Sequence, residues 1–140
     1  MVTGIEASAI SAPPVVDVII PVYRGLAETR RCLESVLAFP QRTACEIMVV
    51  NDCSPEPALS AWLRELAEAQ AIILLENPVN AGFVNTVNRG MMQHPDRDVV
   101  LLNSDAEVHG DWLDRLRHHA ESDPTIGTVT PFSNNATICS

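Results

Sequence analysis

The sequence predicts an α/β fold in which a mostly parallel sheet of about five strands carries helices on both faces. Short apolar runs alternate along the chain with segments whose apolar residues recur at helical spacing. Each short run is apolar throughout, which is typical of parallel strands buried on both faces. With 140 residues, the chain is long enough for one domain with its own core.

The predicted strands are short, rich in Val and Ile, and bounded by residues that favour turns. In chain order they cover residues 15–22, 45–50, 71–75, 98–102 and 126–130. The first, VVDVIIPV, is bounded by prolines, and the second, CEIMVV, ends in the polar cluster NDCSPEP. Residues 1–14, which end in two prolines, predict a flexible leader, and residues 15–140 form the folded part.

Helical spacing of apolar residues predicts four helices, each between two of these strands. They cover residues 26–39, 58–69, 83–93 and 111–121. In the first helix Leu33 and Val36 fall on one face, and Pro40 stops the helix. The third and fourth helices follow Gly82 and Gly110, residues that permit a change of chain direction.

The net charge of the chain argues against nucleic acids as ligands. The net charge is −9, from 9 Lys and Arg against 18 Asp and Glu, whereas proteins that bind nucleic acids usually carry the opposite sign. An acidic protein that binds a phosphate ester must offset the repulsion, with a divalent cation or a helix N-terminus as the usual device.

Cysteine usage and hydropathy indicate a reducing compartment. The four cysteines form no CxxC pair and predict free thiols that are buried or half-buried. No apolar run reaches the ~20 residues that span a bilayer, and the N-terminus lacks the basic region of a signal peptide. The cytoplasm, or the cytoplasmic face of the membrane, is therefore the expected location.

Ligands of such sheets bind beyond the carboxyl ends of the strands, so the residues that follow each strand are the candidates. Tyr23 follows the first strand and can stack on a base, although an ordinary half-buried Tyr is the alternative. Asp52 follows the second strand and can accept hydrogen bonds from a base or a ribose. Its alternative role is at the start of the next helix, which Ser54 could also fill.

The third and fourth strands are followed by a glycine-bearing loop and by an acidic cluster. In NAGFVNTVNRG, Gly82 can adopt a positive φ and Asn80 can form a turn with its own backbone. In LLNSDAEV, Asp105 and Glu107 offer hard oxygen ligands for Mg²⁺ or Mn²⁺. An Asp in an ordinary turn is the alternative.

Five motifs in this order resemble the donor half of an inverting family-2 glycosyltransferase of the GT-A fold, a Rossmann-like nucleotide-binding subdomain. They are VIIPVYRG, MVVNDCSPE, ENPVNAGFVNTVNRG, LLNSDAEV and TPFSNNATICS. The resemblance implies a nucleotide-diphosphate-sugar donor, a divalent metal (Mg²⁺ or Mn²⁺), and sugar transfer to a hydroxyl of a glycan or lipid-linked acceptor. The branch that builds bacterial surface polysaccharides, which includes rhamnosyltransferases, is the most similar.

The resemblance also assigns roles to individual residues. Pro21, Val22 and Tyr23 line the nucleotide pocket, and Asp52 contacts the base. The loop around the nucleotide is shaped by Asn80, Gly82 and Asn88. The turn of the metal-binding DxD motif corresponds to Asn103, Ser104 and Asp105, with Asp105 as the metal ligand.

The sequence departs from the family pattern in two respects. Asn103 replaces the first Asp of DxD, which removes one charge from the metal site. No acidic residue follows Asp123, so the carboxylate that deprotonates the acceptor is expected outside this chain. We therefore expect a donor-binding part that lacks the acceptor half, is inactive alone, and self-associates through the surface that this half would cover.

Other functions remain as alternatives of different weight. A nucleotide-binding module without transfer activity is the main one, because of Asn103 and the absent half. A nucleotidyltransferase would need a basic glycine-rich loop after the first strand, where this chain has only Arg24-Gly25. A nicotinamide dehydrogenase would need GxGxxG at that position.

Overall fold

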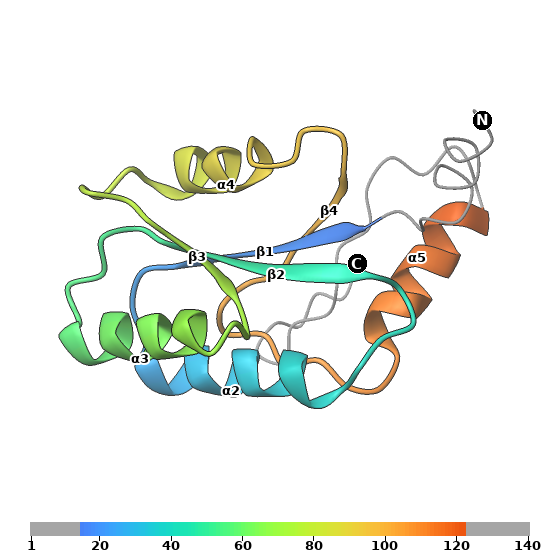
Figure 1. Cartoon of the computed structure of the whole chain (residues 1–140), viewed down its shortest axis with the longest axis horizontal. Coiled ribbons are helices and arrows are strands. Elements are labelled where there is room, and N and C mark those ends of the chain that lie inside the picture. The colour runs from blue at the N-terminus through green and yellow to red at the C-terminus, as the bar shows by residue number, and fades with distance from the viewer. Residues whose placement is uncertain (1–14, 123–140) are drawn as a thin grey trace, which may run out of the picture.

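Strands and helices alternate throughout residues 15–122, the part of the chain that the computed structural model describes (Figure 1). The elements are β1 (Val16–Val22), α2 (Leu26–Ala38), β2 (Cys45–Asn51), α3 (Pro57–Glu68), β3 (Ile73–Glu76), α4 (Phe83–Met91), β4 (Asp98–Leu101) and α5 (Trp112–Ser122). Every strand pairing is parallel, and the strand order is β3-β2-β1-β4. The predicted α/β fold and its parallel sheet are thus confirmed.

The sheet has four strands within the described residues, and not about five as predicted. The fifth strand was expected at residues 126–130, which lie outside the described residues, as does the predicted leader at residues 1–14. The bounds of the other eight elements agree with the predicted ones to within two residues. Strong apolar periodicity and the nearby Pro and Gly residues explain this agreement.

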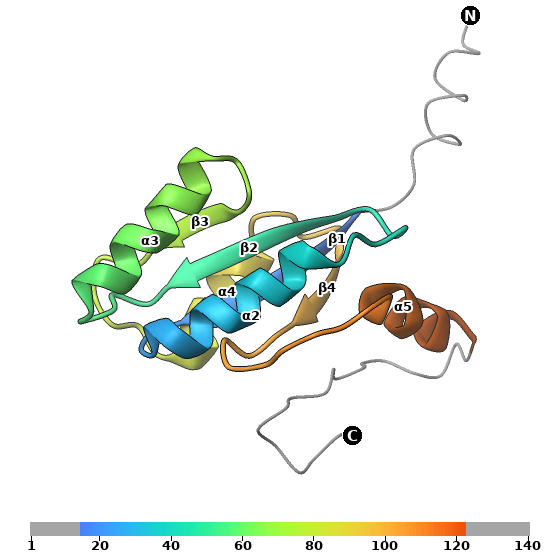
Figure 2. The same ribbon diagram turned by 90° about the horizontal axis from the view of Figure 1, so that it is seen from below.

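The helices cover both faces of the sheet, as the continuous apolar strands predicted. On one face the main core packs β1 and β2 against buried residues of α2, α3 and α5, among them Leu33, Leu63 and Trp112. The other face carries α4 over a smaller cluster of Ile19, Met48 and Val50 (Figures 1 and 2). None of the helices in residues 15–122 is long and apolar enough to cross a membrane.

A glycine allows α4 to approach the sheet closely. Gly90 is buried, and a Cβ atom at this position would lie 3.1 Å from Cγ2 of Ile19 and 3.4 Å from Cγ2 of Val50. The missing side chain therefore fixes the separation between α4 and the strands beneath it. This close packing places the N-terminus of α4 beside the ends of β1 and β2.

The parallel register brings the ends of three strands to one edge of the sheet. Val22, the last residue of β1, pairs with Asn51 of β2, which in turn pairs with Glu76 of β3. On the other side of β1, β4 ends at Leu101, which pairs with Ile19. We call this edge the carboxyl edge. The segments that leave it carry the residues singled out from the sequence.

At the opposite edge, a carboxylate of α5 holds the loop between α2 and β2. Oδ1 of Asp114 accepts hydrogen bonds from the backbone N–H of Thr43 (2.8 Å) and from its hydroxyl (2.6 Å), and Oδ2 accepts one from the N–H of Arg42 (3.0 Å). The Thr43 hydroxyl is the main reason why the pKa of Asp114 lies below its ordinary value.

We predict that Asp114→Ala lowers the free energy of unfolding by roughly 1–2 kcal/mol at pH 7, because three hydrogen bonds to a partly solvated carboxylate are lost. Since the folded state lowers the pKa of Asp114, its contribution is complete above the unfolded pKa and is lost as pH falls through the folded value. Urea unfolding should thus show a constant difference from wild type between pH 7 and 5, which shrinks below about pH 4.

Asp111→Ala is the matched control. Asp111 pairs with Arg115 one helical turn away, and both side chains are about two-thirds exposed, so the cost should stay below about 0.5 kcal/mol. Equal effects of the two substitutions would contradict the role assigned to Asp114.

Candidate functional site

A cavity of about 800 Å³ opens at the carboxyl edge of the sheet. Residues from the segments that follow β1, β2, β3 and β4, together with the first turns of α2 and α4, form its wall. The lining residues are Pro21, Val22, Tyr23, Arg24, Gly25, Glu28, Asp52, Asn80, Gly82, Phe83, Thr86, Asn103, Ser104 and Asp105. Four segments far apart in the sequence therefore meet at one site.

Nine of the ten residues that the sequence analysis proposed line this cavity, and Asn88 does not. Asn88 is exposed on α4. Successive helix residues point about 100° apart, so only some residues of α4 can face the cavity. Thr86 is one of these residues. The sequence analysis missed five lining residues: Arg24, Gly25, Glu28, Phe83 and Thr86. Their positions beside the predicted strand ends were the only available signal.

Asp52 holds the glycine-bearing loop against the end of β2. Its Oδ1 accepts a hydrogen bond from the N–H of Ala81 (2.6 Å), and Oδ2 accepts one from the N–H of Gly82 (3.0 Å). Gly82 has a φ of 89°, a value that favours glycine. The alternative role at the start of α3 is not what Asp52 does, since it bonds to this loop instead.

The environment of Asp52 keeps its carboxyl group ionised. Burial would raise its pKa, but hydrogen bonds from Ala81, Asn77 and Gly82 outweigh burial and lower the pKa below the ordinary value. Only 6% of Asp52 is exposed, so this is a buried negative charge stabilised by dipoles. A carboxylate in this state can only accept hydrogen bonds.

Asn77 connects Asp52 to α4. Its side-chain amide donates to Oδ1 of Asp52 (2.9 Å) and to the hydroxyl of Thr86 (3.0 Å), while its oxygen accepts a bond from Nη1 of Arg89 (2.7 Å). Asn77 is buried, and these bonds satisfy both ends of its amide. Asn77 belongs to the stretch after β3 that the sequence analysis marked, but its central position depends on side-chain directions that no spacing reveals.

The turn after β4 presents Asn103, Ser104 and Asp105 to the cavity. The N–H of Ala106 closes this turn on the carbonyl oxygen of Asn103 (3.0 Å), which also accepts the thiol hydrogen of Cys32 (3.5 Å). Burial, reinforced by the charges of Asp105 and Glu107, raises the pKa of the Cys32 thiol to about 12. The thiol therefore stays protonated and can donate.

The structure differs from two further expectations, which concern Glu107 and the cysteines. Glu107 was offered as a metal ligand beside Asp105, but it pairs with Arg31 of α2 at 3.6 Å and is not among the residues that line the cavity. The thiols were expected to be buried or half-buried, which holds for Cys32 and Cys45, whereas Cys53 is exposed. Cys53 has a φ of 57°, and this bend after Asp52 leaves its side chain on the surface.

The charges on the cavity wall are mostly negative. Glu28, Asp52 and Asp105 contribute carboxylates, and Arg24 is the one cationic residue among those that line the cavity in the described part of the chain. Arg24 lies over the ring of Tyr23, with 5.1 Å between its guanidinium carbon and the ring centroid. A phosphorylated ligand would therefore need a further cation to offset the carboxylates.

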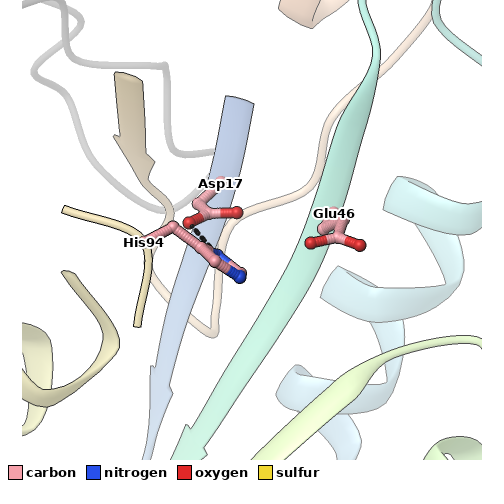
Figure 3. Close-up of side chains that lie close together, drawn as sticks. All are labelled: Asp17, Glu46 and His94. Atoms are coloured by element: carbon pink, nitrogen blue, oxygen red, sulfur yellow. Dashed lines mark hydrogen bonds and ion pairs between the residues drawn. The ribbon is translucent and has the colours of Figure 1, made fainter. Parts of the chain in front are cut away.

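A second group of metal-ligand types lies near the opposite edge of the sheet. Asp17, Glu46 and His94 offer ligand atoms within 4.8 Å of one another, and Figure 3 shows His94 directed at Asp17 beside the strand that carries Glu46. However, Arg97 lies among them: its Nη1 bonds to Oδ1 of Asp17 at 2.9 Å and also bonds to Glu46. Because a guanidinium already supplies the positive charge, we assign this group to the fold and not to a metal.

Comparison with known proteins identifies the family. The model of the family "Glycosyl transferase family 2" matches residues 17–137. Glycosyltransferase GlyA of Streptococcus pneumoniae is 31% identical over 123 residues, which are 86% of this chain and 17% of GlyA. The chain therefore belongs to glycosyl transferase family 2.

Solved structures confirm the GT-A fold. The mannosyltransferase PcManGT from Pyrobaculum calidifontis, in complex with GDP-Man and Mn²⁺, has a TM-score of 0.68 at 23% identity, over 84% of this chain and 35% of its own. TarS 1-349 of S. aureus, in complex with UDP-GlcNAc, has a TM-score of 0.62 at 18% identity, over 84% of this chain and 37% of its own. The chain thus spans about a sixth to about two-fifths of the length of these proteins.

Proposed function

We propose that this chain is the donor-binding part of a glycosyltransferase that moves a sugar from a nucleotide-diphosphate-sugar to an acceptor hydroxyl with inversion. The observation that carries the proposal is the cavity in which Tyr23, Asp52 and Asp105 meet from three strand ends. Structural neighbours in complex with GDP-Man and UDP-GlcNAc support a donor of this class. A role in bacterial surface polysaccharide synthesis, with a glycan or lipid-linked acceptor, rests on the resemblance of the motifs.

In this proposal the nucleoside lies between Tyr23 and Asp52. The Tyr23 ring offers a flat surface for the base. Asp52 accepts hydrogen bonds from Ala81, Asn77, Gly82 and Thr86, which take up the roughly four acceptor positions of a carboxylate. In this proposal an N–H of the base replaces the Thr86 hydroxyl as a donor to Asp52. The imide of uracil or thymine carries one such group and suits this position.

The diphosphate is proposed to lie near Asp105, together with a divalent cation. The residues present fit a cation such as Mg²⁺ or Mn²⁺ that takes one carboxylate from the protein and further oxygens from phosphates and water. Asp105 lines the cavity and supplies that carboxylate, while Asn103 and Ser104 add neutral oxygens. When bound, the cation would stabilise the negative charge of the departing diphosphate.

The residues of this chain orient the donor, and we propose that the base for the acceptor lies outside it. Inverting transfer needs a base within hydrogen-bond reach of the acceptor hydroxyl. Of the three cavity carboxylates, Asp52 is occupied by the loop amides and Asp105 is assigned to the cation. Glu28, in the first turn of α2, is the remaining one, so its substitution tests whether the base lies outside the chain.

A nucleotide-binding module without transfer activity is the second candidate. The observation that favours it is Asn103, whose neutral side chain leaves one carboxylate where the family motif has two. Such a module would bind the same donor at the same site as the proposed glycosyltransferase, but it would not transfer the sugar.

We predict that Asp105→Ala removes the Mn²⁺-dependent part of nucleoside diphosphate binding and leaves the fold intact, because an exposed residue after a strand contributes little to the core. Calorimetry with UDP, dTDP and GDP, with and without Mn²⁺, measures both parts. Asp96→Ala makes the same charge change at an exposed position outside the cavity and should bind like wild type. Equal Mn²⁺ dependence in Asp105→Ala would refute the assignment.

We predict that Asp52→Ala weakens UDP binding by roughly 1.5–3 kcal/mol, the usual range for hydrogen bonds to charged groups. A loop that merely loosens would have a similar effect, so the comparison ligand is N3-methyl-UDP, which lacks the imide N–H. If Asp52 reads the base, wild type should discriminate against the methylated ligand and Asp52→Ala should not. Equal discrimination by both proteins would mean that Asp52 only anchors the loop.

We predict that the 140-residue chain binds nucleotide sugars but does not transfer them. A panel of nucleotide sugars, Mn²⁺, and glycan or lipid-linked acceptors tests this, with product detection by mass spectrometry. Light scattering on the same sample measures the self-association that Val84 and Met92, 67% and 74% exposed on and next to α4, should favour. Metal-dependent transfer by a monomer that is lost in Glu28→Gln would overturn the prediction and identify Glu28 as the base.

A further inference from the structure

We propose that α2 sets the position of Asp105 through Cys32 and Ser35, which act as positioning residues for the cation and the diphosphate. The inference rests on the proposed function, since it concerns the same turn. Two neutral side chains of α2 bond to the backbone on either side of Asp105. They thereby fix the carboxylate without taking part in binding.

The turn itself has little support from the sheet. The strand β4 ends at Leu101, and its last bond to β1 runs from the N–H of Leu102 to the carbonyl of Ile19 (3.0 Å). Beyond this point the backbone leaves the sheet, and Asp105 lies exposed between the buried residues Leu102 and Ala106. The backbone that carries the carboxylate is therefore held by contacts from outside the sheet, and those to residues 103–108 come from α2.

Cys32 and Ser35 form hydrogen bonds to the backbone of residues 103–108 at two points. The Cys32 thiol donates to the carbonyl of Asn103 at 3.5 Å, two residues before Asp105. The Ser35 hydroxyl accepts a bond from the N–H of Val108 at 3.0 Å, three residues after it. Cys32 and Ser35 are three residues apart on α2, so they lie on the same side of the helix.

Further hydrogen bonds fix the geometry of both contacts. The Ser35 hydroxyl donates to the carbonyl of Cys32 at 2.7 Å, which leaves its lone pairs directed at Val108. The carbonyl of Asn103 accepts two bonds, from Ala106 and from Cys32, and so has no free acceptor position. The Arg31–Glu107 pair adds a third contact, but at 3.6 Å and with Arg31 56% exposed it contributes little.

The Cys32 thiol and the Ser35 hydroxyl carry no charge, which suits residues beside a cation site. A Lys or Arg in their place would pair with Asp105 and compete with a divalent ion for it. A thiol and a hydroxyl hold the same backbone without adding charge.

The test compares Cys32→Ala/Ser35→Ala with wild type in the full chain. The fraction of Mn²⁺ bound is measured by electron paramagnetic resonance, with UDP, dTDP or GDP present. We expect the double variant to bind Mn²⁺ about 10-fold more weakly, the lower end of the range for groups that orient a metal ligand. Nucleotide binding without Mn²⁺ should not change. Cys32→Ser keeps a donor and should stay close to wild type.

A second readout needs neither metal nor nucleotide. Backbone hydrogen exchange at Val108, measured by NMR, should accelerate in Ser35→Ala because the amide loses its acceptor. The control variant, Cys45→Ala/Ser122→Ala, removes the same atoms away from the turn and should change neither readout. It also shows whether loss of a thiol and a hydroxyl alone affects folding.

The outcomes distinguish the proposed function from the positioning role of Cys32 and Ser35. If wild type binds no nucleotide with Mn²⁺, the proposed function fails and this inference fails with it. If wild type binds and the double variant binds Mn²⁺ equally well, the proposed function stands and only the inference is overturned. Unchanged exchange at Val108 in Ser35→Ala would likewise overturn it. Weaker Mn²⁺ binding in the double variant, with restored binding in Cys32→Ser, supports the positioning role.

Discussion

The interaction on which the site depends is the one between the Asp52 carboxylate and the amides of Ala81 and Gly82. It joins the end of β2 to the loop before α4, so that two segments almost thirty residues apart form one wall of the cavity. Hydrogen bonds to a charged acceptor are worth about 1.5–3 kcal/mol each, enough to hold a short loop against its conformational entropy. Through Asn77 the same carboxylate is also linked to Arg89, and thus to the last turn of α4.

The two edges of the sheet use buried carboxylates in different ways. At the carboxyl edge, Asp52 is stabilised by backbone and amide dipoles, and it still lines an open cavity. Near the other edge, Asp17 is fully buried, is paired with Arg97 and forms a hydrogen bond with His94. A buried charge that is paired with a side-chain cation is satisfied and closed to ligands. A charge held by dipoles keeps its net negative value, and Asp52 presents this charge on the wall of the cavity.

The sequence was sufficient to predict which segments meet at the site. Apolar runs located the strands, and parallel pairing places strand ends together, so Tyr23, Asp52 and Asp105 could be named before any coordinates. Side-chain directions could not be predicted in the same way. Glu107 lies only two residues from Asp105, but whether it faces the cavity or Arg31 depends on how the chain turns after β4. Asn88, to which the resemblance assigns a role in the loop around the nucleotide, is exposed on α4 and is not among the residues that line the cavity.

The contacts of α2 with residues 103–108, and those of Asp114 with residues 42–43, could not be predicted from the sequence for a further reason. They join residues about seventy positions apart, through backbone atoms that every sequence has in common. Only the partner side chain is specific, and a Cys, a Ser or an Asp on a helix has many other uses. Such contacts become predictable only when the packing of the helix against the segment is known.

The same contacts explain how Asn103 can replace an acidic residue without disturbing the turn. The fold uses the backbone of Asn103, whose carbonyl accepts bonds from Ala106 and Cys32, and the side chain is exposed. A change from carboxylate to amide therefore alters the charge of the site but not its geometry. In the proposed complex this turn supplies one carboxylate, and most of the negative charge around the cation comes from the diphosphate. Cation and nucleotide should consequently bind together, each raising the affinity of the other by the same factor.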